Sequence, residues 1–420
     1  MISLPKRADE RWTDRLGMGH GPISLEDTIS PEFFELEKEA VFRRSWLFIG
    51  RVQQVPRPGD YFTKEIEVLK ASLLVVRDKE MGVRVYHNVC PHRGNKLVWD
   101  THAETEQAGR CTMFVCKFHG LGFGTNGDVA KLTDPKAWLD NQGKALHLAE
   151  VRFELWHGFI FVNLERGGPS RTLREFLGEH FWSGFDGFAF EDMTERFSAR
   201  ANAKANWKTM IDGFGEVYHA ATTHALPFPA AAEMVSAGAS FTGDYYGTHG
   251  QHRQYVMAGY PSDFYQFDYE RITQAFGTGP RHPFAKDYMN LPDGANPTQV
   301  KNWGTSSNMF FPNFYLQLYA PGWIVTYAMW PLAYNRMRFE IEMWMPPSRN
   351  FSEMLSHKSG ISMFLEAALQ DFSLLEAQQA GLETRAFDTY PLTDEEVCVR
   401  HFHQEIYAAV DKYKQEVAHS

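Results

Sequence analysis

The chain has 420 residues, 44% of them apolar, 22% charged and 15% aromatic, which is enough for two domains or one large elaborated domain. The formal net charge of −10 argues against a nucleic-acid-binding protein, since phosphate binding depends on concentrated Lys and Arg. Four cysteines are too few for a disulfide scaffold, and neither a signal peptide nor a run of roughly 20 apolar residues is present. We therefore expect a soluble, cytoplasmic protein.

The first part of the chain changes texture near residue 45. Residues 31–47 have the apolar spacing of an amphipathic helix, so 1–44 are expected to form an N-terminal helical part of the second domain. Residues 45–166 are predicted to form an all-β module, because short β-type runs alternate there with Gly, Pro and Asp breaks. These runs are 61–66, 71–78, 82–89, 112–115 and 158–164. The sequence GGPSR at 167–171 is typical of a linker.

The second domain, residues 167–420, mixes helices and strands. Its predicted helices are 203–220, 361–380 ending at Gly381, and a final surface helix at 393–416. Its predicted strands are 309–319, 323–330 and 336–345, which follow one another closely enough to be antiparallel neighbours. The expected fold class is therefore α+β, with an all-β module followed by helices on an antiparallel sheet.

A first metal site is predicted inside the β module. NVCPHRGN and VCKFHGLGF together contain C-x-H, a gap of 23 residues and C-x-x-H, which supply Cys90, His92, Cys116 and His119. A tetrahedral zinc site is one interpretation. Thiolates on one iron and imidazoles on the other, as in a Rieske [2Fe–2S] cluster, fit the repeated Cys-then-His order on Gly-rich loops better. The other two cysteines, Cys111 and Cys398, are expected to be buried free thiols.

A second metal site is predicted in the segment EVYHAATTH. His219 and His224 are five residues apart, about 140° out of phase on an ideal helix, so a helix must end or distort between them if both bind one metal. Two His and one carboxylate are the ligands of non-heme iron oxygenases. Glu216 is the nearest carboxylate, whereas Asp371 lies in the apolar stripe of a later helix, where an acid is costly unless it is paired or bound to metal.

Both motifs resemble the α subunit of the Rieske non-heme iron oxygenases of the aromatic-ring-hydroxylating type, and the resemblance covers most of the chain. It implies a cluster on Cys90, His92, Cys116 and His119, and a mononuclear Fe(II) on the triad of His219, His224 and Asp371. Two departures concern the loop shape: 99–111 look like an insertion, and Lys117 and Leu121 replace the Pro and Trp that are common in the family.

The resemblance also implies roles for two further acids, our candidate catalytic residues Glu216 and Asp212. An acid at the position of Glu216 links the iron-ligand His219 to the cluster-ligand His119 of a neighbouring subunit in a head-to-tail trimer. Most members have Asp at that position. Asp212 stands where many members have Asn, and it either supports the iron site or caps polar groups nearby.

The expected function is that of a terminal oxygenase, which takes electrons at the cluster and activates O₂ at the iron to hydroxylate an aromatic or other apolar small molecule. The alternatives are an oxidative N- or O-demethylase of the same family and a non-catalytic Rieske electron-transfer protein. No dinucleotide or P-loop motif is present, so we expect NAD(P)H to act only indirectly, through a reductase with or without a ferredoxin. The assembly is expected to be α₃, or α₃β₃ with a small subunit. Phe214, Phe310, Phe311 and Tyr315 are candidates for an apolar pocket or for core.

Overall fold

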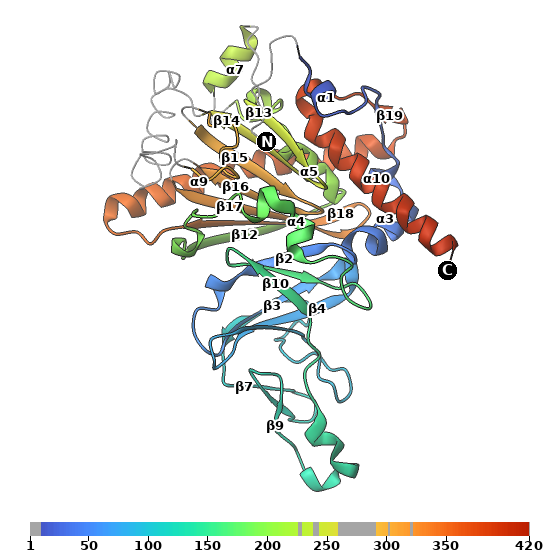
Figure 1. Cartoon of the computed structure of the whole chain (residues 1–420), viewed down its shortest axis with the longest axis vertical. Helices are drawn as coiled ribbons and strands as arrows, with labels where there is room; N and C mark the ends of the chain where they lie inside the picture. The colour runs from blue at the N-terminus through green and yellow to red at the C-terminus, as the bar shows by residue number, and fades with distance from the viewer. Residues whose placement is uncertain are drawn as a thin grey trace. The chain divides into compact units, whose positions relative to one another are not determined.

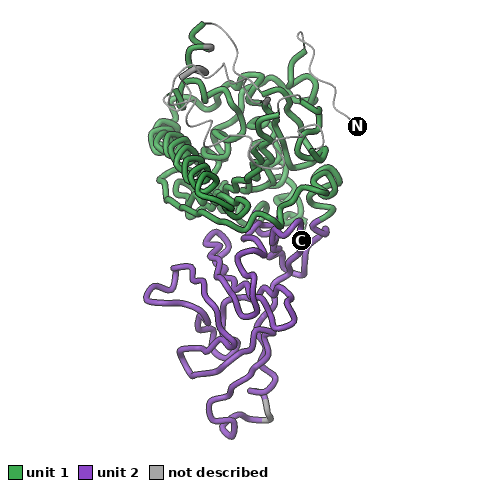
Figure 2. Tube along the Cα trace, turned by 90° about the vertical axis from the view of Figure 1, so that its left-hand side faces the viewer, with its two compact units in different colours: residues 1–41, 174–420 green, residues 42–173 purple. Residues whose placement is uncertain are grey.

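The computed structural model describes residues 10–225, 229–237, 243–258, 291–300, 303–319 and 322–419. Within it the chain divides into two compact units, residues 42–173 and residues 1–41 with 174–420, which Figure 2 shows in different colours. Among the described residues, no helix has both the length and the apolar character needed to cross a membrane.

The unit of residues 42–173 is built from strands, as the sequence predicts. A four-stranded sheet has the order β5-β4-β3-β6, and two three-stranded sheets have the orders β10-β11-β2 and β7-β8-β9. The central β4 is apolar at four consecutive positions, Leu73 to Val76, and all four side chains are buried. The strands are β2 Trp46–Arg51, β3 Asp60–Ile66, β4 Ala71–Arg77, β5 Val83–His87, β6 Ala108–Arg110, β7 Met113–Val115, β8 Gly122–Gly124, β9 Val129–Lys131, β10 Arg152–Trp156 and β11 Phe159–Asn163.

The larger unit contains a seven-stranded antiparallel sheet of order β12-β18-β17-β16-β15-β14-β13 (Figure 1). Its strands are β12 Glu195–Ala203, β13 Tyr245–His249, β14 His252–Ala258, β15 Trp303–Phe310, β16 Phe314–Tyr319, β17 Trp323–Ala333 and β18 Arg336–Met345. A separate two-stranded ladder pairs β1 Ile23–Ser24 with β19 Thr389–Tyr390. The helices are α1 Trp12–Arg15, α2 Glu26–Ile29, α3 Pro31–Glu37, α4 Leu173–Trp182, α5 Trp207–Phe214, α6 Ala220–Thr223, α7 Pro229–Ser236, α9 Phe351–Glu383 and α10 Val397–Ala418. The predicted α+β class is confirmed.

Helices α5 and α9 pack on one face of this sheet. The ring of Phe214 in α5 stacks on Tyr327 of β17 with centroids 4.5 Å apart, and Phe364 of α9 meets Tyr319 of β16 edge-on, also at 4.5 Å. Aromatic pairs of this kind add to the stabilisation that comes from buried apolar area. The sheet is therefore the surface that holds α9, which carries Asp371, and α5, which leads to His219.

Several predicted elements have the wrong extent. In place of the helix predicted at 31–47, the α-helix α3 ends at Glu37. A π-helical turn follows over Lys38–Phe42, and β2 begins at Trp46. The helix predicted at 203–220 is helical only from Trp207, after Asn206 caps it, to Phe214, because residue 203 still belongs to β12. The strand predicted at 309–319 is a hairpin, since residues 311–313 form the turn between β15 and β16.

The helix predicted at 361–380 is longer at both ends. It begins after Asn350, whose side chain accepts the Glu353 backbone N–H as an N-cap, and it runs past Gly381. A glycine inside a helix costs only about 1 kcal/mol, and the buried Gln379 holds the last turns by accepting the Asn206 backbone N–H at 2.8 Å. The final helix is α10, and it is not a surface helix throughout, because its first seven residues are all buried. Cys398 is buried as expected, but Cys111 is only half-buried, because it lies beside the short edge strand β6.

Candidate metal centres

Two loops with the same backbone geometry carry Cys90 and Cys116. In the first, the backbone N–H of Cys90 donates to Asn95 O at 2.8 Å and that of Gly94 donates to Cys90 O at 3.0 Å. In the second, Cys116 donates to Leu121 O at 2.8 Å and Gly120 to Cys116 O at 2.9 Å. Gly94 and Gly120 both have positive φ, +75° and +71°, a conformation that glycine adopts without strain. The two loops are structural repeats, so they present their Cys and His side chains in equivalent ways.

The side chains of these loops converge in a manner that fits a cluster. Both thiols are buried, and burial raises the pKa of the Cys90 thiol. The His92 and His119 rings lie 4.8 Å apart, and His92 Nδ1 is buried without a hydrogen-bond partner. Buried nitrogen atoms are almost always paired, so this atom has the environment of a ligand atom. The amide of Asn95 lies 3.8 Å from Cys116 Sγ, close enough to donate a weak hydrogen bond to a thiolate.

The second site is built around the single helical turn α6. Helix α5 ends at Phe214, and Gly215 follows as its C-cap. His219 is then the N-cap of α6 and His224 its C-cap, so the two histidines flank the turn instead of sharing one helix face. Glu216 fixes the start of this turn, because its Oε2 accepts the backbone N–H of His219 at 3.0 Å. The helix end that the five-residue spacing requires is at Thr223, after which His224 leaves the helical conformation.

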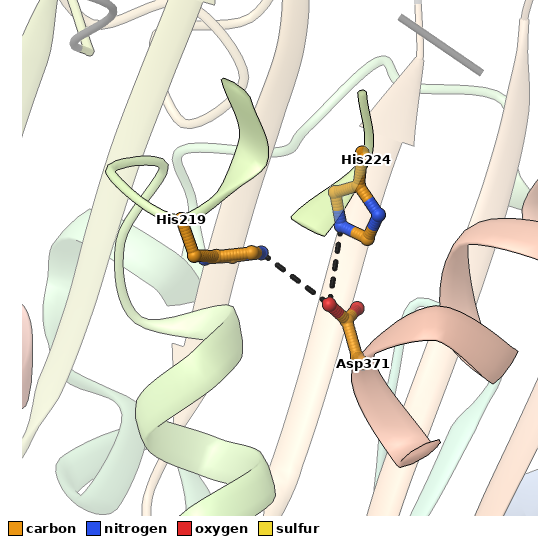
Figure 3. A group of neighbouring side chains, drawn as sticks. All are labelled: His219, His224 and Asp371. Atoms are coloured by element: carbon orange, nitrogen blue, oxygen red, sulfur yellow. Dashed lines mark ion pairs between the residues drawn. The ribbon is translucent and has the colours of Figure 1, made fainter. Parts of the chain in front are cut away.

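Helix α9 brings Asp371 to both histidines (Figure 3). Asp371 Oδ1 lies 3.1 Å from His224 Nε2 and 3.4 Å from His219 Nε2. Among the described residues, these three form a group whose ligand atoms lie within 4.8 Å of one another, which is suitable for one metal ion. Two neutral imidazoles and one carboxylate leave open coordination positions on iron. Glu216 is not part of this group.

The Nδ1 atoms of both histidines are held by other side chains. His219 Nδ1 lies 2.5 Å from Glu216 Oε1, and His224 Nδ1 lies 2.9 Å from Gln370 Oε1. Gln370 in turn donates from Nε2 to Glu366 Oε1 at 3.1 Å. A hydrogen bond at one ring nitrogen fixes the tautomer and leaves the lone pair of the other nitrogen available to a metal. The sequence interpretation did not identify Gln370, although its position next to Asp371 was a usable signal.

The charges of this group favour a cation at its centre. Burial opposes the charged form of His219, but hydrogen bonds and charges from Asp371 and Glu216 outweigh it and raise its pKa to about 10. Burial would raise the pKa of Asp371, yet its hydrogen bonds to the two histidines lower it. The carboxylates therefore hold a positive charge between them, and a divalent cation can take the place of that proton.

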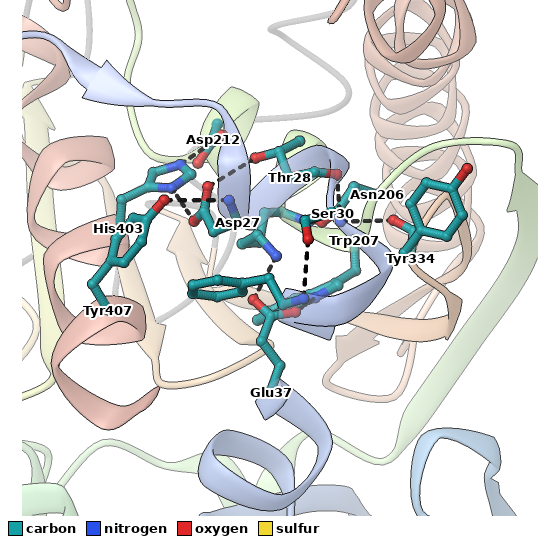
Figure 4. A network of polar contacts seen from close by, with 12 residues as sticks. Asp27, Thr28, Ser30, Glu37, Asn206, Trp207, Asp212, Tyr334, His403 and Tyr407 are labelled. Atoms are coloured by element: carbon teal, nitrogen blue, oxygen red, sulfur yellow. Dashed lines mark hydrogen bonds and ion pairs between the residues drawn. The ribbon is translucent and has the colours of Figure 1, made fainter. Parts of the chain in front are cut away.

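Asp212 belongs to a different cluster of buried polar groups (Figure 4). Its Oδ2 lies 3.2 Å from His403 Nε2, while His403 Nδ1 lies 2.6 Å from Asp27 Oδ2. Burial opposes the charged form of His403, but the two carboxylates raise its pKa to about 10. Of the two roles expected for Asp212, the contacts correspond to pairing with a nearby polar group, which here is a histidine of α10.

A buried ion pair lies in the same region and holds the start of α5. Lys208 Nζ is 2.6 Å from Glu37 Oε1, and both side chains are fully buried. Trp207 Nε1 also donates to Glu37 Oε2, at 3.4 Å. Together, the ion pair and the Asp27–His403–Asp212 cluster connect α5 to α2, α3 and α10, so they support the segment that leads to Glu216 and His219.

The four aromatic residues named as pocket candidates are all buried. Tyr315 donates its hydroxyl to Ile211 O at 3.0 Å and lies on the sheet face covered by α5, where its ring is 6.0 Å from that of Phe214 in this helix. Phe310 is on the opposite face, 4.8 Å from the Phe181 ring, and Phe311 lies in the turn after β15. Only two of the four are therefore on the face that supports the triad.

Comparison with known protein families gives two matches. The Rieske [2Fe–2S] domain matches residues 45–148, and the catalytic domain of the ring-hydroxylating alpha subunits matches residues 190–412. Together these domains imply one [2Fe–2S] cluster and one mononuclear iron that works with O₂. The alternative of a zinc site in the β module receives no support.

Several known proteins are similar to parts or most of this chain. The large oxygenase component of the naphthalene 1,2-dioxygenase system of Pseudomonas aeruginosa is 36% identical over 200 residues, which is 46% of this chain and 42% of that protein. Choline monooxygenase of Spinacia oleracea is 26% identical over 386 residues, covering 89% of this chain and 74% of the relative. The chain thus spans less than half the length of the first relative.

A solved structure of naphthalene 1,2-dioxygenase with indole bound in the active site has the same fold. It superposes with a TM-score of 0.69 at 21% identity, covering 93% of this chain and 92% of the other. At this identity the likeness concerns the fold alone. With the matched catalytic domain covering more than half of the sequence, the chain belongs to the family of ring-hydroxylating alpha subunits and carries a Rieske [2Fe–2S] domain.

Proposed function

We propose that the chain is the terminal oxygenase component of a Rieske non-heme iron system that hydroxylates a small organic molecule. The observation that carries the proposal is the His219–His224–Asp371 group, with both Nε2 atoms facing one carboxylate oxygen, in a chain that also carries the Cys90 and Cys116 loops. A purely electron-transferring Rieske protein has no use for the second group. Similarity to both a dioxygenase component and a monooxygenase supports oxygenation without deciding how many oxygen atoms are inserted.

In this proposal each set of residues has one task. Cys90, His92, Cys116 and His119 hold the [2Fe–2S] cluster, and His219, His224 and Asp371 hold the mononuclear iron, which supplies O₂ activation when it is bound. Glu216 and Gln370 keep the Nδ1 protons of the two histidines in place, so that the Nε2 lone pairs point toward the metal. Asp212 acts indirectly, by anchoring α5 to His403.

Glu216 is also proposed to link two subunits. Its carboxylate contacts His219 within its own chain, and His119 of a neighbouring subunit would complete the path from cluster to iron in a head-to-tail trimer. The distribution of charge supports such an assembly. Residues 42–173 contain 19 Lys and Arg against 14 Asp and Glu, a net charge of +5, whereas the remaining residues carry −15. Unlike charges on the two units favour contact between the β unit of one copy and the larger unit of the next.

Electrons must reach the cluster from another protein, since the chain has no dinucleotide-binding motif. We propose a reductase, with or without a ferredoxin, as the electron donor. The basic β unit would favour an acidic donor, and the rate of reduction would then fall as ionic strength rises.

Metal and sulfide analysis of the purified protein tests the proposed function. About three iron atoms per two acid-labile sulfides per chain is the expected ratio for one cluster and one mononuclear site. O₂ consumption with NADH, a surrogate reductase and a substrate panel should then follow. Two iron atoms per two sulfides that do not rise to three on reconstitution with Fe(II) would leave only the electron-transfer alternative. Zinc without sulfide would contradict the proposal entirely.

A further inference from the structure

The sheet face below the triad carries a connected set of polar side chains. Strand register places Tyr255 opposite Ser307, and Ser307 opposite Gln317. Tyr319 is two residues beyond Gln317 in β16, so both side chains point to the same face of the sheet. Tyr315, two residues before Gln317, is also on this face, and it pairs with Tyr327 of β17, which therefore shares the face. These five residues, Tyr255, Ser307, Gln317, Tyr319 and Tyr327, are called the polar row below.

The polar row faces α9, which carries Asp371, and α5, which leads to His219. Phe214 of α5 stacks on Tyr327, and Phe364 of α9 covers Tyr319. Asp371 is seven residues, or about two turns and 10 Å, beyond Phe364 on the same side of α9. Burial raises the pKa of Tyr255, and the charges of Glu216 and Asp371 raise it further. The row therefore lies beside the site where O₂ chemistry is proposed, among aromatic rings.

Among the residues that the structure describes, the hydrogen bonds of the row leave two donor hydrogens without an acceptor. Tyr319 donates to Gln317 Oε1 at 2.6 Å, and Gln317 Nε2 donates to Ser307 Oγ at 3.3 Å. Ser307 and Tyr255 share a further hydrogen bond. Only one of those two hydroxyls can donate in that bond. One hydroxyl hydrogen and the second hydrogen of the Gln317 amide therefore have no acceptor within the described part of the chain. A buried donor that stays unpaired is costly, so both are suited to an acceptor that arrives from outside the chain.

A buried glutamine on the opposite face of the sheet provides a contrast. Gln254 Nε2 donates to Gly294 O and to Asn308 Oδ1, both at 2.6 Å, while its Oε1 lies 3.2 Å from His180 Nε2. Every hydrogen-bonding position of that amide is used within the chain. The open end of the polar row is therefore a property of the face that supports the triad, not of all polar residues in this sheet.

We propose that the polar row binds an oxygen atom of the substrate, so that the substrate is an aromatic compound carrying a hydroxyl, carbonyl or carboxylate oxygen rather than a plain hydrocarbon. This inference rests on the proposed function, because it takes the triad as the reacting centre. A site built to hydrogen-bond a substrate group discriminates strongly against an analogue that lacks the group, since its own polar atoms are then left unpaired. Gln317 and Tyr255 are the specificity-determining residues.

The test compares the binding of 1-naphthol and naphthalene to the purified full-length protein by titration calorimetry. The wild type should bind 1-naphthol at least about tenfold more tightly, which is the effect of roughly one well-made hydrogen bond. In Gln317→Leu this preference should fall below about threefold, with naphthalene affinity unchanged or improved. Thr326→Val is the matched control, because Thr326 is equally buried and pairs with Leu316 on the opposite face. It should keep the wild-type preference.

Two kinds of result would overturn the inference. One is a wild-type protein that shows no preference for 1-naphthol, either because 1-naphthol and naphthalene bind equally or because neither of them binds. Tighter binding of choline than of 1-naphthol and naphthalene would count in the same way. The other is an equal loss of both affinities in Gln317→Leu together with a lowered melting temperature, which would make the row purely structural. Binding is measured independently of turnover, so a failed iron-to-sulfide ratio would contradict the proposed function without deciding the ligand preference.

Discussion

Replacing Lys208 by Met should destabilise the larger unit strongly. Lys208 and Glu37 form a 2.6 Å ion pair with no exposed surface on either side chain, so the variant leaves a carboxylate buried without its counter-ion. Breaking such a pair costs about 3–5 kcal/mol. The unit contains about 290 residues, for which unfolding entropy near 0.6 kcal/mol/K converts that cost to a fall in melting temperature of about 5–8 °C.

Scanning calorimetry of the single and double variants measures this effect, with the visible spectrum of the cluster recorded in parallel. The double variant Glu37→Met with Lys208→Met should recover to within about 2 °C of wild type, because two apolar side chains of similar size replace two buried charges. Arg174→Met is the control, since Arg174 pairs with Glu179 at 3.0 Å on an exposed surface and should cost under about 1 kcal/mol. A double variant that melts as low as the sum of the single changes would refute the reasoning.

Four further predictions concern the triad and its supports. Asp371→Ala should remove mononuclear iron, measured by metal analysis, and leave the cluster spectrum intact; loss of both together would contradict the assignment. Glu216→Gln should retain both metal centres but slow electron transfer between them in single-turnover experiments, and an unchanged rate would argue against the bridge. Burial opposes the charged form of His403, but Asp27 and Asp212 raise its folded-state pKa to about 10, so its stabilising effect is complete below about pH 6.5 and is lost as the pH rises toward 10. The difference in melting temperature between wild type and His403→Gln should therefore narrow over that pH range. A constant difference would show that the charge of His403 is not responsible. Gly360→Ala should lower the melting temperature and the iron content of the larger unit, because the new Cβ would lie 1.6 Å from the Trp323 ring. An unchanged melting temperature together with an unchanged iron content would show that α9 can shift freely.

The sequence by itself determined the family, the cofactors and the α+β class. Its ligand motifs are short and local: Cys90 with His92, Cys116 with His119, and His219 with His224 are each within five residues, so their spacing is visible without a structure. The five-residue spacing of the last pair also predicted a break in the helix, and the structure has His219 and His224 at the two ends of α6. Element boundaries were less predictable, because Asn206 and Asn350 each begin a helix by capping its N-terminus, whereas Gly381 does not end one.

Tertiary structure alone decided which side chains support the predicted ligands. Gln370 reaches His224 across 146 residues, His403 reaches Asp27 across 376, and Lys208 reaches Glu37 across 171. The polar row likewise exists only because strand register brings Tyr255, Ser307 and Gln317 side by side. Such contacts depend on packing between segments that are distant in sequence, and no local spacing encodes them. Ligand types follow from chemistry that neighbouring residues share, whereas the groups that orient those ligands and select a substrate follow from the fold.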